Sequence, residues 1–220
     1  MPEPPPMLRE WLGPTPVDDF ARTHLQKLPC AAAGTTGSAV ALGDWDMLGR
    51  VLAAGPDVLV VARGSLLEVA PPRDLAELGL LMAAGVGLCV RHAERCDPVL
   101  ADLAAAFAAD LPGEVQVQLF VTPGGTHGFG WHFDGEDVFI AQTIGIKDYF
   151  FRANSVAPEG PVGDFHRIER EASQLCTARL EPGDFLYIPT RWWHMAKCLR
   201  DSLSISLGVF PRRRRLPARS

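Results

Sequence analysis

The sequence predicts a mainly β protein, an antiparallel sandwich or barrel preceded by helices. From Glu114 onward, apolar residues alternate with other residues, as they do on strands. Short apolar segments there are separated by Gly and Pro turns, and helical spacing is found before residue 113. The chain has 220 residues, 47% of them hydrophobic and 21% charged, which suits one globular domain.

The first half of the chain is mixed in its patterning. Residues 1–16 carry several prolines and are expected to form a loose arm. A single domain is expected over 17–210, in which 17–113 extend a barrel core at 114–210. The extension is predicted to contain helices and strands at 17–28, 57–62, 73–84, 87–90 and 98–110. We expect these helices to support the outside of the barrel.

The second half reads as a series of strands. Val117, Leu119 and Val121 alternate with Gln118 and Phe120, which is typical of a strand with two different faces. Further strands are predicted at 138–144, 146–152, 176–180, 185–189, 192–198 and 202–210. These segments supply enough strands for a closed sandwich or barrel.

Composition narrows the class of protein further. The longest nearly apolar stretch, 80–90, is shorter than the roughly 18 residues that span a bilayer, and the first residues show no secretory pattern. Five cysteines without a CxxC pair favour reduced thiols, so a cytoplasmic protein is expected. A net charge of −5 argues against nucleic acid as the partner. The basic tail at 211–220, with Arg212–Arg215, is expected to be solvated.

A metal site is predicted from three residues. His132 and Asp134 stand two positions apart, so on a strand both side chains project from the same face and can reach one ion. His194 follows a turn, a strand and a proline, and is the candidate third ligand. Two histidines and one carboxylate are the ligand set of mononuclear Fe(II) oxygenases.

The residues around these ligands resemble a known family. The segments 122–125, 128–134 and 137–142 are similar to those of the JmjC-type cupin oxygenases, in the branch that holds the ribosomal oxygenases and an asparaginyl hydroxylase. The segment 181–189 also matches the turn and strand that precede the last ligand. The resemblance extends over 17–210 and implies a double-stranded β-helix (cupin, jelly-roll) barrel. The ribosomal oxygenases continue into further domains after the barrel, so the resemblance does not extend to a ribosomal substrate.

The resemblance also implies cofactors. The family binds Fe(II) through residues equivalent to His132, Asp134 and His194, and uses 2-oxoglutarate and O₂. A basic residue fifteen positions after the first histidine holds the distal carboxylate of 2-oxoglutarate, and this position is Lys147. A lysine inside an apolar barrel is costly unless it is paired, and a dicarboxylate would supply the pair.

A second contact to 2-oxoglutarate is harder to assign. The asparaginyl hydroxylase has a threonine three positions before its first ligand, whereas this chain has Phe129. Other inward-facing polar residues are therefore candidates for cosubstrate binding: Gln116, Thr143, Ser204 and Ser206.

The resulting functional hypothesis is an Fe(II)- and 2-oxoglutarate-dependent dioxygenase that hydroxylates a protein or peptide side chain and releases succinate and CO₂. An oxygenase of small molecules or natural products would use the same residues, and a non-catalytic metal-binding cupin is the third alternative. The partner is thus a peptide or small molecule, with no membrane involved and a homodimer as one possible assembly.

Overall fold

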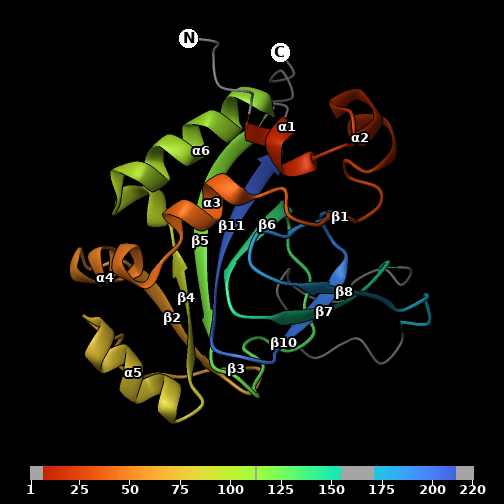
Figure 1. Ribbon diagram of the computed structural model, residues 1–220. Coiled ribbons are helices and arrows are strands. Elements are labelled where there is room, and N and C mark those ends of the chain that lie inside the picture. The colour runs from red at the N-terminus through yellow and green to blue at the C-terminus, as the bar shows by residue number, and fades with distance from the viewer. Residues whose placement is uncertain (1–6, 112, 155–170, 212–220) are drawn as a thin grey trace, which may run out of the picture.

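Two antiparallel sheets packed face to face form the centre of the computed structural model, which describes residues 7–111, 113–154 and 171–211. Helices cover the outer face of the larger sheet, and the smaller sheet covers its other face (Figure 1). The prediction of a mainly β sandwich with supporting helices is therefore confirmed.

The elements follow one another from a helical first half to a strand-rich second half. The helices are α1 (Met7–Leu12), α2 (Val17–Thr23), α3 (Gly37–Leu42), α4 (Trp45–Ala53), α5 (Leu75–Ala83), η1 (Ala93–Arg95) and α6 (Pro98–Asp110). The strands are β1 (Cys30–Ala32), β2 (Asp57–Ala62), β3 (Ser65–Leu66), β4 (Gly87–Arg91), β5 (Gly113–Thr122), β6 (Asp137–Ile144), β7 (Lys147–Arg152), β8 (Cys176–Leu180), β9 (Phe185–Ile188), β10 (Trp193–Cys198) and β11 (Ser202–Pro211).

The larger sheet has the strand order β1-β9-β6-β11-β5-β4-β2-β3, and the smaller one the order β10-β7-β8. Strand β11 lies between β5 and β6, and its pairing with β5 runs from Ser202–Thr122 to Pro211–Gly113. The last strand of the chain therefore sits in the middle of the sheet and joins the first half of the protein to the second.

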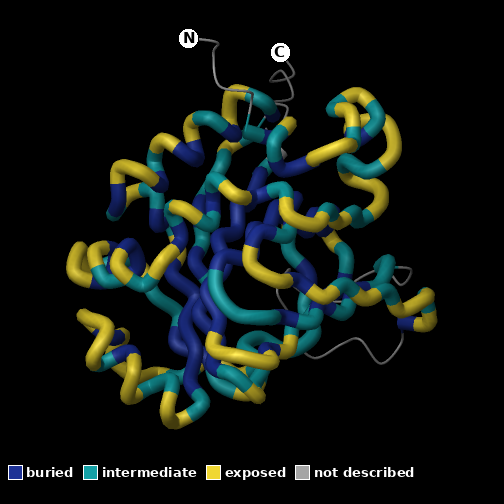
Figure 2. The backbone as a smooth tube through the Cα atoms, viewed as in Figure 1, coloured by how far each residue is buried: buried dark blue, intermediate teal, exposed yellow. Residues whose placement is uncertain are grey.

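The larger sheet is buried on both faces, and each face belongs to a different core. In β6, Phe139 and Ala141 pack with the helices, whereas Val138 and Ile140 pack against the smaller sheet. Residues 138–141 of β6 are therefore apolar without alternation, because successive side chains meet two different layers. Figure 2 shows the buried strands enclosed by helices whose outer surfaces are exposed.

Three of the helices begin at aspartates. The side chains of Asp44, Asp74 and Asp97 accept hydrogen bonds from backbone N–H groups in the first turns of α4, α5 and α6, respectively. This satisfies donors that the helix itself leaves without partners. Pro98 follows Asp97 at the first position of α6, where a proline costs no hydrogen bond.

Several sequence-based expectations need correction. Residues 7–12 are not part of a loose arm: they form α1, and Leu8, Trp11 and Leu12 are buried in the helix-side core. Their spacing of three and four residues places them on one helical face, a pattern that the flanking prolines concealed. The helix expected at 17–28 ends at Thr23, and α3, α4 and β1 were not predicted. Residues 1–6 and Arg212–Arg215 lie outside the described residues.

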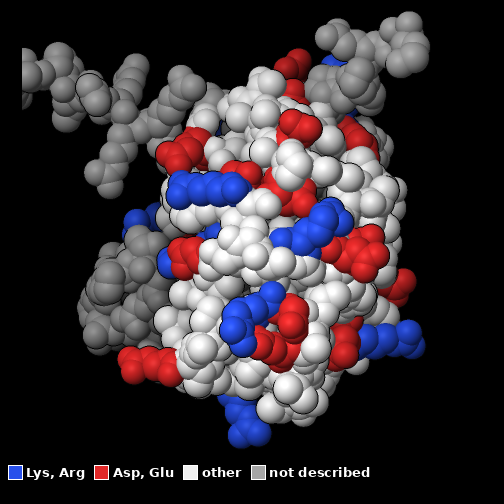
Figure 3. All heavy atoms as spheres, turned by 90° about the vertical axis from the view of Figure 1, so that its left-hand side faces the viewer, with Lys and Arg blue, Asp and Glu red and all other residues white. Residues whose placement is uncertain are grey.

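The helix-covered surface carries charges of both signs. Acidic and basic side chains are interspersed on this face in Figure 3. Ion pairs at the helices include Arg73–Glu77 and Arg50–Asp97. In the part of the chain that the structure describes, no helix has the length and apolar character needed to cross a membrane.

The buried position of α1 gives a stability prediction. Trp11 is 0% exposed, and its ring centroid lies 5.1 Å from that of Phe107 and 6.0 Å from that of Phe185. Trp11→Ala should lower the free energy of unfolding in urea by about 3–5 kcal/mol, because it leaves a cavity between helix and sheet. Leu80→Ala, at a residue that is 76% exposed, should change it by less than about 0.5 kcal/mol. Equal effects of the two changes would show that α1 is not part of the core.

Candidate metal centre

A short backbone bridge brings the two candidate histidines together. The N–H of His132 donates to the carbonyl of His194 (3.1 Å), and the N–H of His194 donates to the carbonyl of His132 (2.8 Å). His194 lies on β10, whereas His132 belongs to the loop between β5 and β6. The two imidazole rings consequently lie side by side, with centroids 4.2 Å apart.

The aspartate is held by the loop that precedes β10. The backbone carbonyl of Asp134 accepts from the N–H of Arg191 at 2.8 Å and from the Thr190 hydroxyl at 3.4 Å. Phe133 points the other way into the protein and packs edge-on against Trp193. His132 and Asp134 therefore share a side without lying on a regular strand, which corrects the expectation that a strand would align them: β6 begins only at Asp137.

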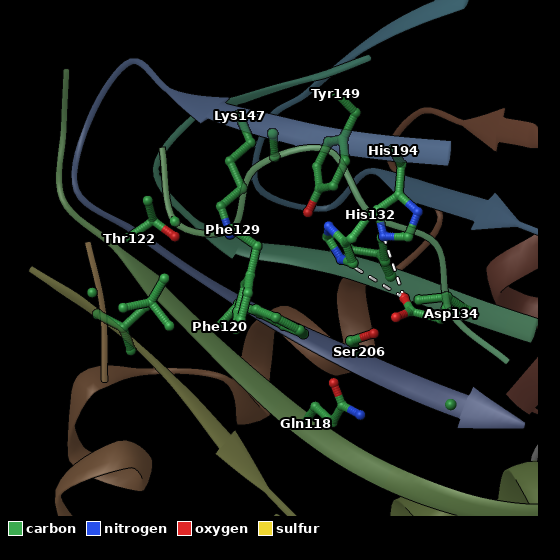
Figure 4. Close-up of a pocket in the computed structure, with 18 of the residues that line it drawn as sticks. Gln118, Phe120, Thr122, Phe129, His132, Asp134, Lys147, Tyr149, His194 and Ser206 are labelled. Carbon is green, nitrogen blue, oxygen red and sulfur yellow. Dashed lines mark ion pairs between the residues drawn. The ribbon is translucent and has the colours of Figure 1, made fainter. Parts of the chain in front are cut away.

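The three side chains converge on one point. Oδ2 of Asp134 lies 3.3 Å from Nε2 of His194 and 4.0 Å from Nε2 of His132, and the three candidate ligand atoms all lie within 4.8 Å of one another. Figure 4 shows both rings directed at this carboxylate. Two imidazole nitrogens and a carboxylate oxygen at this spacing fit a divalent first-row metal ion such as Fe(II).

The second nitrogen of each ring orients it for this role. Nδ1 of His132 lies 2.8 Å from the Gly130 carbonyl, and Nδ1 of His194 lies 3.0 Å from the Trp192 carbonyl. Because a carbonyl oxygen only accepts, each Nδ1 donates a hydrogen, and the lone pair of the neutral ring is left on Nε2. Metal-binding histidines are typically oriented by such an outer hydrogen bond.

Burial and mutual charge set the protonation of the group. Burial lowers the pKa of His132 to about 4, and the neighbouring His194 adds to this effect. Burial alone would raise the pKa of Asp134, but the charges of both histidines and the hydrogen bond from His194 bring it to about 2. For His194, burial is outweighed by the Asp134 hydrogen bond and charge, so its pKa is raised. The group thus offers a permanent carboxylate and one proton that a metal ion can displace.

Lys147 lies in the same pocket as these three residues. Its side chain is directed inward from the first position of β7 and is only 3% exposed. Nζ donates to Oγ of Ser204 at 3.1 Å and stands 5.8 Å from the centre of the Phe120 ring. Burial lowers the pKa of this lysine. A cation in this position fits the far carboxylate of a dicarboxylic acid whose other end is near the histidines.

The other candidate cosubstrate residues lie in different places. Ser204 contacts Lys147, whereas Thr143 faces the opposite side of the sheet: its hydroxyl donates to the Leu203 carbonyl, and a Cβ on Gly43 would lie 2.5 Å from its methyl carbon. Gln116 donates to Glu114 near the exposed end of β5. Neither Gln116 nor Thr143 lines the pocket, so both assignments were wrong. Ser206 does line it, as expected.

The wrong assignments have a physical cause. A period of two shows which residues of a strand share a face, but both faces of this sheet are buried, so the pattern does not show which face lines the pocket. Gln116 is on the pocket face, but it pairs with Gly208, four residues along β11 from Ser204, which corresponds to about 13 Å.

Sequence reasoning missed some pocket residues. Gln118, Thr122 and Tyr149 all line the cavity. The signal for Tyr149 was present, because it stands two positions after Lys147 on a strand and must point the same way.

Two acidic residues follow the aspartate, and the structure separates their roles. Asp137 is buried and accepts hydrogen bonds from the Tyr187 hydroxyl (2.6 Å) and the Thr190 N–H (3.2 Å), so it fixes the loop that holds Asp134. Glu136 lines the pocket. Its burial and the charge of Asp134 raise the pKa of Glu136 to about 7.

Fold and site together define a two-sheet barrel that carries a two-histidine, one-carboxylate metal centre. The family model described as the JmjC domain matches residues 95–215, which is more than half of the chain. The chain belongs to the JmjC-domain oxygenase family.

Curated relatives match the same region. The bifunctional lysine-specific demethylase and histidyl-hydroxylase NO66 of Dictyostelium discoideum is 34% identical over 99 residues, which are 43% of this chain and 19% of that protein. Ribosomal oxygenase 1 of Gallus gallus is 35% identical over 94 residues, which are 41% of this chain and 16% of that protein. The matched region is therefore less than a fifth of the length of either relative.

Solved structures confirm the fold. The X-ray structure of Escherichia coli YcfD superposes with a TM-score of 0.70 at 23% identity, covering 91% of this chain and 54% of that one. The same ribosomal oxygenase in complex with cobalt and 2-oxoglutarate gives a TM-score of 0.67 at 22% identity, with coverages of 92% and 53%. The double-stranded β-helix expected from the sequence is thereby confirmed.

Removal of one ligand should abolish metal binding. Asp134→Ala should weaken the affinity for Co(II), measured by calorimetry, by more than about 100-fold, because even an outer partner of a ligand is worth roughly 10–100-fold. His127→Ala is the matched control, since His127 lies in the same loop but outside the converging group. Similar losses in the two variants would contradict the assignment of Asp134 as a ligand.

The protonation pattern predicts how metal affinity depends on pH. The pKa of Asp134 is about 2, so the proton that an incoming ion displaces comes from His194, whose pKa is raised. Affinity for Co(II) should therefore be constant above the His194 pKa and fall about tenfold per pH unit below it. Calorimetry in two buffers of different ionisation enthalpy should detect one proton released per ion at low pH. An affinity that rises on acidification would contradict this scheme.

Proposed function

We propose that this protein is an Fe(II)- and 2-oxoglutarate-dependent oxygenase that hydroxylates a side chain of a protein or peptide. The observation that carries the proposal is the presence of two distinct binding groups in one pocket. His132, Asp134 and His194 form the first, and Lys147 forms the second. A metal group alone would suit many functions, whereas a buried cation beside it is the complement of a 2-oxo dicarboxylate.

The pocket residues would have separate roles in this reaction. His132, Asp134 and His194 would hold Fe(II), and Lys147 would bind the distal carboxylate of 2-oxoglutarate. When bound, the iron supplies O₂ activation, in which 2-oxoglutarate is converted to succinate and CO₂ and one oxygen atom is inserted into a substrate C–H bond. Phe120, Phe129, Val138 and Ile140 line the pocket with apolar surface and would keep water from the reacting groups.

A macromolecular substrate is favoured by the relatives. The matched proteins include a histidyl-hydroxylase and ribosomal oxygenases. These names support a reaction on the side chain of a protein or peptide. Because the match covers a small part of those proteins, the identity of the substrate protein has to be found by experiment. The cytoplasm is the compartment we propose, since the five cysteines are free and such thiols persist in a reducing environment.

The proposal is tested by turnover of the full chain. Protein supplied with Fe(II), 2-oxoglutarate, O₂ and a panel of peptides should release succinate and add the mass of one oxygen atom to a peptide. His132→Ala should abolish both signals, because it removes a ligand, and His127→Ala should retain them.

The outcomes separate the alternatives. Succinate and an oxygenated product found only with small molecules would replace the peptide substrate by a small-molecule one. Succinate release no greater than that of His132→Ala across both panels would overturn the oxygenase proposal and leave a metal-binding cupin.

A further inference from the structure

The Lys147 ammonium group has more hydrogen-bond donors than the side chains around it accept. It has three N–H donors and is buried, and Ser204 Oγ is the side-chain acceptor that it reaches, at 3.1 Å. Within the described ranges, no carboxylate lies within ion-pair distance of Nζ. A carboxylate bound there would receive one strong contact from Lys147, and a carboxylate has two oxygens that each accept hydrogen bonds. A second donor is therefore needed to fix its orientation.

Tyr149 is placed to be that donor. It stands two positions after Lys147 on β7, where buried residues alternate with half-buried ones, so both side chains project from the same face. Its partner across the sheet on β10 is Ala196, a small residue that also lines the pocket. Figure 4 shows the Tyr149 hydroxyl pointing into the pocket between Lys147 and His132.

Ser204 connects the two side chains. It accepts a hydrogen bond from Lys147, and its hydroxyl lies close enough to the Tyr149 phenol to oppose part of the rise in the pKa of that group. Because an ammonium group only donates, the Ser204 hydrogen is left for another acceptor, for which the Tyr149 oxygen is available, and in that arrangement the phenol hydrogen is left for a ligand. Burial raises the pKa of Tyr149, so the phenol keeps this hydrogen at neutral pH.

We propose that Tyr149 donates the second hydrogen bond to the distal carboxylate of the cosubstrate, beside Lys147, and that Ser204 is the positioning residue that links them. This rests on the proposed function. It would replace the contact that the asparaginyl hydroxylase obtains from a threonine three positions before its first metal ligand, where this chain has Phe129. The consequence is selectivity: Tyr149 favours 2-oxo acids with a second carboxylate and is indifferent to 2-oxo acids without one.

The test measures binding to the Co(II)-loaded full chain, without turnover. Tyr149→Phe removes the hydroxyl and keeps the ring. It should weaken 2-oxoglutarate binding in calorimetry by roughly 10- to 100-fold, the usual effect of losing a hydrogen bond to a charged group. Binding of 2-oxobutanoate, which has no distal carboxylate, should be unchanged. This second ligand distinguishes recognition of the carboxylate from a general disturbance of the pocket.

Tyr187→Phe is the matched control, because Tyr187 is the chain's other tyrosine and its hydroxyl bonds Asp137, away from Lys147. Because the Thr190 N–H still holds Asp137 in this variant, Tyr187→Phe should lower the melting temperature and, at saturating Co(II), leave the affinity for 2-oxoglutarate unchanged. Thr122→Val tests the other hydroxyl that lines this end of the pocket, and should also leave the affinity unchanged.

Four results would overturn the inference. These are an unchanged affinity of Tyr149→Phe for 2-oxoglutarate, an equal loss for both 2-oxo acids, a comparable loss in Tyr187→Phe, or a loss in Thr122→Val as large as that in Tyr149→Phe. A wild-type protein that binds Co(II) but not 2-oxoglutarate would reject the proposed function itself, which distinguishes that failure from the failure of Tyr149 alone.

Discussion

The site depends on two backbone hydrogen bonds between residues that are far apart in the sequence. His132 and His194 exchange N–H and carbonyl contacts, and this bridge sets the distance between the rings. His132 lies in a loop, so it is not held by the regular hydrogen bonds of a β-strand. Metal donors must be placed within a fraction of an ångström, so a loop ligand requires such an anchor to a strand. Asp134 obtains its anchor in the same way, from the backbone of Arg191.

The two faces of the larger sheet divide stability from function. On the helix side, Leu119, Phe139 and Ile205 contribute to one apolar core that also contains Trp11 of α1 and Phe107 of α6. Burial of this kind is the main source of folding free energy. The opposite face can then carry polar side chains such as Gln118, although these add little to stability. The helices of the first half thus stabilise a sheet whose other surface is available for binding.

Charged side chains that line the pocket lower the stability of the fold. The pocket holds the charge of Lys147, which is buried, together with the half-buried carboxylate of Asp134. Buried charges without a full set of partners destabilise a fold, and native proteins retain them chiefly where a function requires them. A cation bound at the histidines and an anion bound at Lys147 would each supply the opposite charge that the pocket residues lack. Both ligands would therefore bind the folded chain in preference to the unfolded one.

The sequence by itself determined the positions of the strands in the second half and the candidate ligands His132, Asp134 and His194, and the resemblance to a known family added the lysine fifteen positions after the first of them. Each is encoded locally, by alternation, turns or a short motif. The helix-forming face of α1 and the aspartate cap of α4 were encoded locally too, but prolines and short helix lengths obscured them, whereas the helix that begins after Asp74 was predicted. Tertiary structure alone decided that Thr143 faces the helices and that the face shared by Lys147 and Tyr149 is the one that lines the metal centre. Alternation with a period of two shows which side chains of a strand share a face. The layer that covers each face comes from distant parts of the chain, so which layer a face meets is fixed only when the sheets and helices pack.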